Sequence, residues 1–117
     1  MKPTAEKPNT LNLNAQFTRL YKSGVSCVRP TRVLYARKNG LMRNRWGITV
    51  SKKIGKAHLR NRAKRRMRAI ARENSGILKP GLDFVLVARS RTVTGEYSAL
   101  MRDFEVAAEK VGVKKDD

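Results

Sequence analysis

The sequence predicts a small α+β domain, a sandwich in which helices pack against one sheet in the order α-β-β-α-β-α. Three observations support this prediction. The chain has 117 residues, a usual size for a single domain. The stretch from Ser51 to Arg72 repeats its apolar residues with the period of a helix. The run from Asp83 to Ala88 is continuously apolar, as in a central strand that is covered on both faces.

The N-terminal part divides into a leader and a first helix. Residues 1–10 contain two prolines and little to bury, so we expect a flexible leader before a domain that spans 11–112. Residues 11–24 have the apolar face of a helix, made by Leu13, Phe17, Leu20 and Tyr21. Asn14 is suited to the N-cap and Gly24 to the stop.

Two extended segments follow. Residues 25–37 read as strand, and Pro30 bends or divides this segment because proline cannot donate a ladder hydrogen bond. The Asn39-Gly40 pair is favoured in tight hairpins, although the polar residues after it suggest a longer loop. A second strand over 45–51 comes next, and we expect it to pair antiparallel with the first.

The basic helix is the dominant feature of the sequence. Its apolar stripe, which we expect to face the core, consists of Leu59, Ala63, Met67 and Ile70. The opposite side carries Asn61, Lys64, Arg65, Arg68 and Arg72, with Arg60, Arg62 and Arg66 along the flanks. Lys52, Lys53 and a hinge at Gly55 lead into the helix, which should end near Asn74-Ser75-Gly76.

The C-terminal part predicts the last strand and helix. After the strand Asp83–Ala88, the segment from Arg89 through the threonines is expected to be a polar loop, in which Thr94 caps the final helix. The buried stripe of that helix is predicted to be Tyr97, Leu100, Met101, Phe104, Ala108 and Val111, with a stop at Gly112. We expect residues 113–117 to be a frayed tail.

The charge of the chain indicates a polyanionic partner. Lys and Arg number 27 against 9 Asp and Glu, the net charge is +18, and no acid lies between Lys7 and Arg72. A solvated charged face is the ordinary alternative, but such faces mix signs, so nucleic acid is favoured. Without an apolar run of bilayer length we expect no membrane contact. The single cysteine, Cys27, fits a small strand residue in a reducing cytoplasm.

The sequence offers no catalytic or metal-binding constellation. His58 is the only histidine, and the basic stretch contains no Asp or Glu to hold a metal ion. RNA is favoured over DNA because Phe17 and Tyr21, with Val33 and Tyr35 on one face of a strand, could form a platform for stacked bases. The alternative is that these aromatic residues belong to the core.

The residues from Val50 to Ala57, followed by Arg60-Asn61-Arg62-Ala63-Lys64-Arg65 and Arg68, resemble the signature of the bacterial ribonuclease P protein subunit. The similarity extends over about Leu11 to Val111. In this family a catalytic RNA removes the 5′ leader of precursor tRNA, and the protein is its auxiliary, which also broadens the range of substrates. The resemblance implies a fold like the second domain of ribosomal protein S5, with a left-handed β-α-β crossover.

The resemblance also implies two binding surfaces. The surface for the catalytic RNA would consist of Lys52, Lys53, Lys56, Arg60, Asn61, Arg62, Lys64, Arg65, Arg68 and Arg72. The cleft for the precursor tRNA leader would consist of Phe17, Tyr21, Val33, Tyr35 and Arg89. Mg²⁺ would be bound mainly by the RNA, with Asn61 close to an RNA-bound ion. Weak self-association is a further expectation.

Three positions depart from the family pattern, in which aliphatic residues are more usual. Arg66 borders the apolar stripe, and we expect its stem to cover the core edge while its guanidinium reaches outward. Trp46 is expected to add core area, with stacking on RNA as the alternative. His58 is expected to be a surface or partly packed residue. Two other functions stay open from the sequence: a ribosomal protein that only stabilises rRNA, and a nuclease active without RNA.

Overall fold

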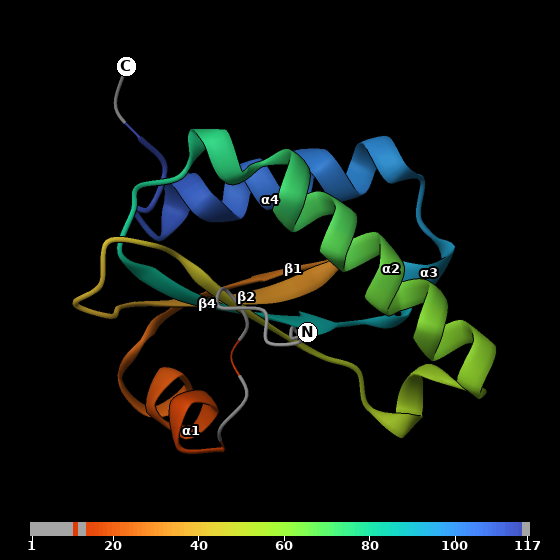
Figure 1. The fold of residues 1–117 in the computed structure, drawn as a ribbon. Helices are drawn as coiled ribbons and strands as arrows, with labels where there is room; N and C mark the ends of the chain where they lie inside the picture. The colour runs from red at the N-terminus through yellow and green to blue at the C-terminus, as the bar shows by residue number, and fades with distance from the viewer. Residues whose placement is uncertain (1–10, 12–13, 116–117) are drawn as a thin grey trace, which may run out of the picture.

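The computed structural model describes Leu11 and residues 14–115, which form a four-stranded sheet with helices on both faces (Figure 1). The α+β class is therefore confirmed. In chain order the elements are α1 (Asn14–Ser23), β1 (Val25–Arg29), β2 (Arg32–Lys38), β3 (Arg45–Thr49), the 3₁₀ turn η1 (Lys52–Ile54), α2 (Ala57–Glu73), the 3₁₀ turn η2 (Ser75–Ile77), β4 (Leu82–Ala88), α3 (Ser90–Thr94) and α4 (Tyr97–Lys110). The predicted leader, Leu13 and the last two residues lie outside the described residues.

The sheet has the strand order β1-β2-β4-β3. β1 pairs antiparallel with β2, and β2 pairs antiparallel with β4, whereas β3 pairs parallel with β4. The prediction that strand 45–51 pairs antiparallel with the first strand is therefore wrong. The apolar strand β4 takes the central place because both of its faces can be buried, and α2 returns the chain from β3 so that β3 and β4 run in the same direction. The left-handed sense of this β3-α2-β4 crossover stays a prediction from the resemblance.

The loop between β2 and β3 crosses the end of β4 instead of closing a hairpin. The backbone NH of Asn39 donates to the Gly81 carbonyl at 3.0 Å, and the Asn39 side chain donates to Asp83 at 3.0 Å. Gly81 has a φ of 82° and lies so close to the loop that a Cβ there would be 2.8 Å from the Leu41 carbonyl oxygen. These contacts carry the chain from β2 past β4, so the longer loop suggested by the polar residues after Asn39-Gly40 is the one observed.

Pro30 divides the first extended segment into β1 and β2, as predicted. Alternation along β2 places Leu34 and Ala36 in the main core, on the face covered by α2 and α4 (Figure 1). Tyr35 lies on the other face, with Phe17 of α1 packed against the same small cluster. The two sides of β2 thus face different layers of the molecule.

The main core lies between the sheet and the helices α2 and α4. Its largest fully buried apolar side chains come from every layer, among them Leu34, Phe84, Met67, Ile70, Leu100 and Phe104. Trp46 stacks on Phe84 with ring centroids 4.4 Å apart, so its predicted contribution to the core is confirmed. The second cluster, under α1, is much smaller and is centred on Leu11, Leu20 and Val85. A short helix over a four-stranded sheet leaves part of that face uncovered.

The segment after β4 is a helix, which corrects two predictions. Residues 90–94 form α3 instead of a polar loop, and the N-cap of α4 is Glu96 instead of Thr94. The cause is Thr92, which is fully buried. Its hydroxyl accepts a hydrogen bond from the Arg89 NH and donates to the Thr31 carbonyl, so the segment turns back on the β1–β2 connection.

The residues after Gly112 are docked and not frayed, which corrects the predicted tail as far as the structure describes it. Val113 is 4% exposed, and its carbonyl accepts from the Lys79 NH at 2.8 Å. Lys114 forms an antiparallel bridge with Leu78. One buried valine and this short ladder are enough to hold residues 113–115 against the segment before β4.

Candidate nucleic-acid interface

The exposed side of α2 forms a continuous basic surface. Ala63, Met67 and Ile70 of the predicted apolar stripe are buried, Leu59 is only half-buried, and Ala71 is buried in addition. The residues that the sequence predicted for RNA binding lie on the other sides of the helix or just before it. Lys52, Lys53, Lys56, Asn61, Arg62, Arg65, Arg68 and Arg72 are exposed, and Arg60 and Lys64 are half-buried. His58 is exposed as well, as predicted.

The positive charge of this surface is not neutralised by acidic side chains of the described residues. Among the described residues, the ion pairs within 4.0 Å join Arg29 to Asp103, Arg45 to Asp83, and Lys114 to Glu105 and Glu109. None of these pairs includes a side chain of α2. A row of cations without acidic partners raises the electrostatic potential along the helix and favours a polyanion over solvent ions.

Arg66 is the exception among the cations of α2, and the prediction that its guanidinium reaches outward is wrong. Its Nη1 donates to the carbonyls of Thr92, Val93 and Gly95, at 2.9, 3.1 and 2.8 Å. Burial, followed by the nearby charge of Arg62, lowers the pKa of Arg66. This guanidinium satisfies carbonyls at the end of the short helix α3, so Arg66 is a structural residue that fixes α3 against α2.

Arg62 takes part in the same contact, although it was predicted to bind RNA. Its Nε donates to the Val93 carbonyl at 3.2 Å, while the residue as a whole stays exposed. One edge of the guanidinium is therefore used by the protein, and the other donors remain directed at solvent.

The aromatic residues predicted for the cleft come together on the sheet face under α1. Tyr21 and Tyr35 form an edge-to-face pair with ring centroids 4.9 Å apart, and the Tyr21 hydroxyl is 3.4 Å from the Thr49 hydroxyl. Tyr21 is 44% exposed, whereas Phe17 and Tyr35 are half-buried. Phe17 and Tyr35 pack against the small core cluster, as the core alternative expects, whereas the Tyr21 ring keeps an exposed side. The role of these rings as a platform for stacked bases stays a prediction.

Phe17 reaches its position because β3 contains a glycine there. A Cβ at Gly47 would lie 2.6 Å from Cε1 and 2.7 Å from Cζ of Phe17. Only a residue without a side chain lets the edge of the Phe17 ring come this close to the strand. Gly47 is thus a residue of this site that requires the tertiary structure to explain it.

The uncovered part of the same sheet face continues from Tyr35 toward the other end of β2. Val33 is half-buried beside its cross-strand partners Val28 and Val87, and Val28 is 63% exposed. The surface there is apolar, open and bordered by the end of β4. It extends the aromatic patch along the sheet face to Val28, which was not among the residues expected from the sequence. This strip of sheet face from Tyr21 and Tyr35 to Val33 and Val28 is called the groove below.

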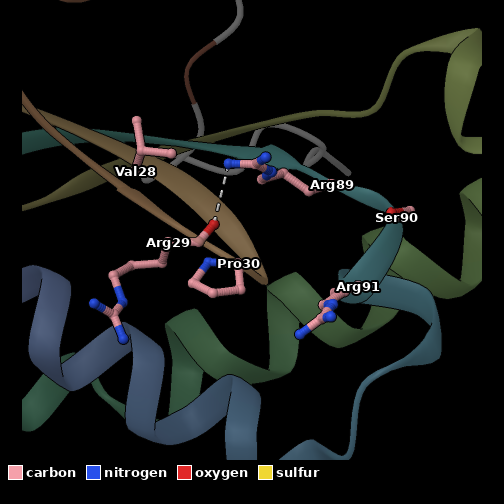
Figure 2. Close-up of a pocket in the computed structure, with 6 residues that line it drawn as sticks. All are labelled: Val28, Arg29, Pro30, Arg89, Ser90 and Arg91. Carbon is pink, nitrogen blue, oxygen red and sulfur yellow. Dashed lines mark hydrogen bonds between the residues drawn. The ribbon is translucent and has the colours of Figure 1, made fainter.

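Arg89 closes this groove at the end of β4. It lines a pocket of about 500 Å³ together with Val28, Pro30 and Arg91 (Figure 2). Its Nη1 donates to the Arg29 carbonyl at 3.4 Å, as the dashed line in Figure 2 marks. The predicted site residue Arg89 is therefore brought to the end of the groove. Arg91 is exposed and lines the same pocket, but its side chain points away from Arg89 (Figure 2).

The Arg29 side chain itself points away from this groove toward α4, where it holds the hairpin in place. It donates to Asp103 at 3.0 Å, and the Thr31 hydroxyl donates to the same carboxylate at 2.9 Å. Burial alone would raise the pKa of Asp103, but the hydrogen bonds from Arg29 and Thr31 together with the charge of Arg29 lower it. This ionic contact fixes the Pro30 turn, and with it the rim of the groove.

Comparison with known proteins gives the family of the chain. The family model described as Ribonuclease P matches residues 5–112. The chain belongs to this family. The ribonuclease P protein component of Clostridium acetobutylicum is 39% identical over 109 residues, which are 92% of each protein. The solved structure of the Staphylococcus aureus RNase P protein is similar with a TM-score of 0.81 at 29% identity, covering 93% of this chain and 100% of that one. The RNase P protein of Thermotoga maritima gives a TM-score of 0.74 at 32% identity, covering 83% and 92%.

Membership in the ribonuclease P protein family makes the chain a component of a ribonucleoprotein that processes tRNA, with RNA as its partner. None of the helices in the described part of the chain is long and apolar enough to span a membrane. Within those residues, no three His, Cys, Asp or Glu side chains gather into a group that could hold a metal ion. The chemistry that these surfaces support is binding, through cations on one face and aromatic rings on the other.

Proposed function

We propose that the exposed side of α2 binds the catalytic RNA of ribonuclease P, and that the groove under α1 binds the 5′ leader of precursor tRNA. The observation that carries this proposal is the separation of the two surfaces. α2 lies on one side of the sheet, and α1 lies on the other (Figure 1). One small protein can therefore contact two RNA segments at once, and each segment meets a surface of suitable chemistry.

The α2 surface is suited to the RNA backbone. Its exposed cations, among them Arg65 and Arg68, can contact phosphates without reading the bases, which gives affinity with little sequence preference. The same charges reduce the repulsion between the two RNAs. We therefore propose that the protein lowers the Mg²⁺ demand of the complex and broadens its substrate range, while Mg²⁺ itself is bound mainly by the RNA, with Asn61 close to one ion.

The groove is suited to a single strand. Each base stacked on an aromatic side chain adds about 1–3 kcal/mol of binding free energy. Tyr21 and Tyr35 supply ring surface, and Arg89 supplies a cation for the backbone at the far end. Mature tRNA lacks the leader, so these contacts favour the precursor over the product. In this proposal the protein orients the substrate, and the RNA breaks the phosphodiester bond.

The test compares the affinities of the reconstituted enzyme for precursor and mature tRNA. Tyr21 is the best position for it because the ring is partly exposed and its loss does not open the main core. Tyr21→Ala should lower the precursor-to-mature affinity ratio by about 5- to 150-fold, and Tyr21→Phe, which keeps the ring, should restore most of it. An unchanged ratio in Tyr21→Ala would refute leader binding in the groove, and full loss in Tyr21→Phe would refute stacking as its cause.

Two broader expectations belong to the same proposal. A cytoplasmic location follows from the tRNA substrate and from a single cysteine, Cys27, which is half-buried in β1. Weak self-association is compatible with the exposed Val25 and Val28 of the edge strand β1, which are 51% and 63% exposed. Sedimentation of the RNA-free chain over a range of concentrations tests the second expectation, and a constant monomer mass would exclude it.

A further inference from the structure

A second pocket lies at the end of the sheet opposite to Arg89. It has a volume of about 540 Å³, within the range of small-ligand sites. It is bounded by the last residues of β2, the loop that follows β2, the turn before β4 and the segment after α4. Neither of the two proposed RNA surfaces includes it. Arg32 and Lys38, at the two ends of β2, are about 20 Å apart at the rise of a β-strand.

The floor of this pocket is apolar and the rim is cationic. Ala36, Leu82 and Val113 are 1%, 7% and 4% exposed and form part of the lining. Lys38 and Lys79 also line it, and both are exposed. A third cation, Arg37, belongs to the lining as well, and no Asp or Glu does. A ligand suited to this pocket has an apolar surface for the floor and a negative charge for the rim.

The walls are held in place by backbone turns. Gly40, Gly81 and Gly112 all line the pocket, with φ values of 75°, 82° and 78°. Positive φ values are favoured by glycine, so a glycine suits the turn at each of these three positions. The Lys79 ammonium donates to the Gly112 carbonyl at 3.1 Å, which joins two of the walls. The pocket is therefore a formed feature of the fold and not a gap between mobile chains.

We propose that this pocket binds one unpaired nucleotide of the partner RNA, with the base on the apolar floor and the phosphate on the Lys38 and Lys79 rim. The inference rests on the proposed function only in taking RNA as the partner. Leu41, which is 37% exposed, forms part of the wall and offers apolar contact to the base. The site would give the protein a third contact, at the end of the sheet remote from Arg89.

The first test follows the glycine amides of the full-length chain in ¹⁵N-correlated NMR spectra. Adenosine 5′-monophosphate should shift the amides of Gly40, Gly81 and Gly112 together. Adenosine alone and inorganic phosphate alone should each shift them less, because each lacks one half of the contact. If inorganic phosphate shifts the three amides as much as the nucleotide does, the pocket binds anions in general and the proposal is wrong. The proposal is also wrong if the nucleotide shifts none of the three glycine amides.

The second test uses a matched pair of substitutions in the loop after β2. Leu41→Asp places a carboxylate in the pocket wall, whereas Met42→Asp places the same charge on a neighbour that is 93% exposed and does not line the pocket. Leu41→Asp should weaken adenosine 5′-monophosphate binding at least about fivefold, because the new carboxylate lies close to the phosphate and repels it. Met42→Asp should change it less than about twofold. If both variants lose the same affinity, the loss comes from the long-range effect of the added charge, and the proposed binding in the pocket is wrong.

A charge variant covers the case in which Leu41→Asp unfolds the chain. Lys38→Ala should weaken nucleotide binding, and Arg102→Ala, which removes an exposed cation from α4, should not. If instead Leu41→Asp abolishes a concentration-dependent dimer and leaves nucleotide binding unchanged, the pocket serves a second copy of the chain and the proposal is wrong. These results do not depend on leader binding, because the Tyr21 variants leave this pocket intact.

Discussion

Arg65 and Arg66 are neighbours in the sequence with opposite surroundings, and a matched pair of substitutions separates their roles. Arg65 is exposed on the basic side of α2. Arg66 Nη1 donates to the carbonyls of Thr92, Val93 and Gly95 at 2.8 to 3.1 Å. Arg65→Met and Arg66→Met each remove a guanidinium and keep an unbranched stem. We expect the first to weaken RNA binding and the second to destabilise the protein.

The magnitude for Arg66 follows from its contacts. A hydrogen bond from a charged donor contributes about 1.5–3 kcal/mol. One nitrogen serves three carbonyls here, and the burial that lowers the pKa of Arg66 offsets part of the gain. We therefore expect Arg66→Met to lower the free energy of unfolding by about 2 kcal/mol, which corresponds to about 6–10 °C in Tm for a chain of this size. Arg65→Met should stay within about 0.5 kcal/mol of the wild type.

Two measurements check this pair. Urea unfolding followed by circular dichroism gives the stabilities, and binding of the catalytic RNA at several salt concentrations gives the slope of log K against log salt. Arg65→Met should reduce that slope by about 0.7–0.9, the share of one phosphate contact, and Arg66→Met should leave it unchanged. If Arg66→Met is as stable as the wild type, or reduces the slope as much as Arg65→Met does, the structural role assigned to Arg66 is refuted.

Two further predictions concern packing and pH. Gly47→Ala should lower the free energy of unfolding by about 1–3 kcal/mol, because its Cβ would lie 2.6 Å from the Phe17 ring. The control is Gly76→Ala, whose Cβ would have no atom within 4 Å, and it should leave the free energy of unfolding unchanged. Urea unfolding measures both variants, and equal stabilities would contradict the prediction. Asp103→Asn should cost about 1–3 kcal/mol at pH 7. Hydrogen bonds, chiefly from Arg29, outweigh burial and lower the pKa of Asp103, so its contribution is present above the ordinary value of 3.8 and is lost as the pH falls through the lowered pKa. Urea unfolding should show that the difference in stability between the wild type and Asp103→Asn is smaller below pH 3.8 than at pH 7. The same difference at both pH values would contradict this prediction.

The sequence predicted correctly those features of the fold that depend on residues close together in the chain. The period of α2, the end of α1 at Gly24, the division at Pro30 and the buried strand β4 were all predicted correctly. Each of these features depends on side-chain periodicity or on the backbone chemistry of one residue. The candidate RNA residues of α2 were identifiable for the same reason, because the helix period decides which side chains leave the core.

The groove was predictable only in part. Its aromatic residues followed from the spacing of Phe17 and Tyr21 and from the alternation of β2. Val28 could join them only when β1 was known to pair with β2 in a register that places it opposite Val33. A register is a relation between two strands, and one strand by itself does not contain it.

Taken alone, the sequence determined the long helices and the strands, which sides of them are apolar, and that the chain carries a large excess of positive charge. Only the tertiary structure decided that β3 pairs with β4, that Thr92 makes a helix of a polar segment, and that Arg66 serves the fold while Arg65 faces solvent. The physical reason is that these outcomes depend on hydrogen-bond partners distant in the chain. Thr92 and Arg66 are bonded to carbonyls 61 and 26 to 29 residues away, and no local pattern specifies which carbonyl a buried donor will meet.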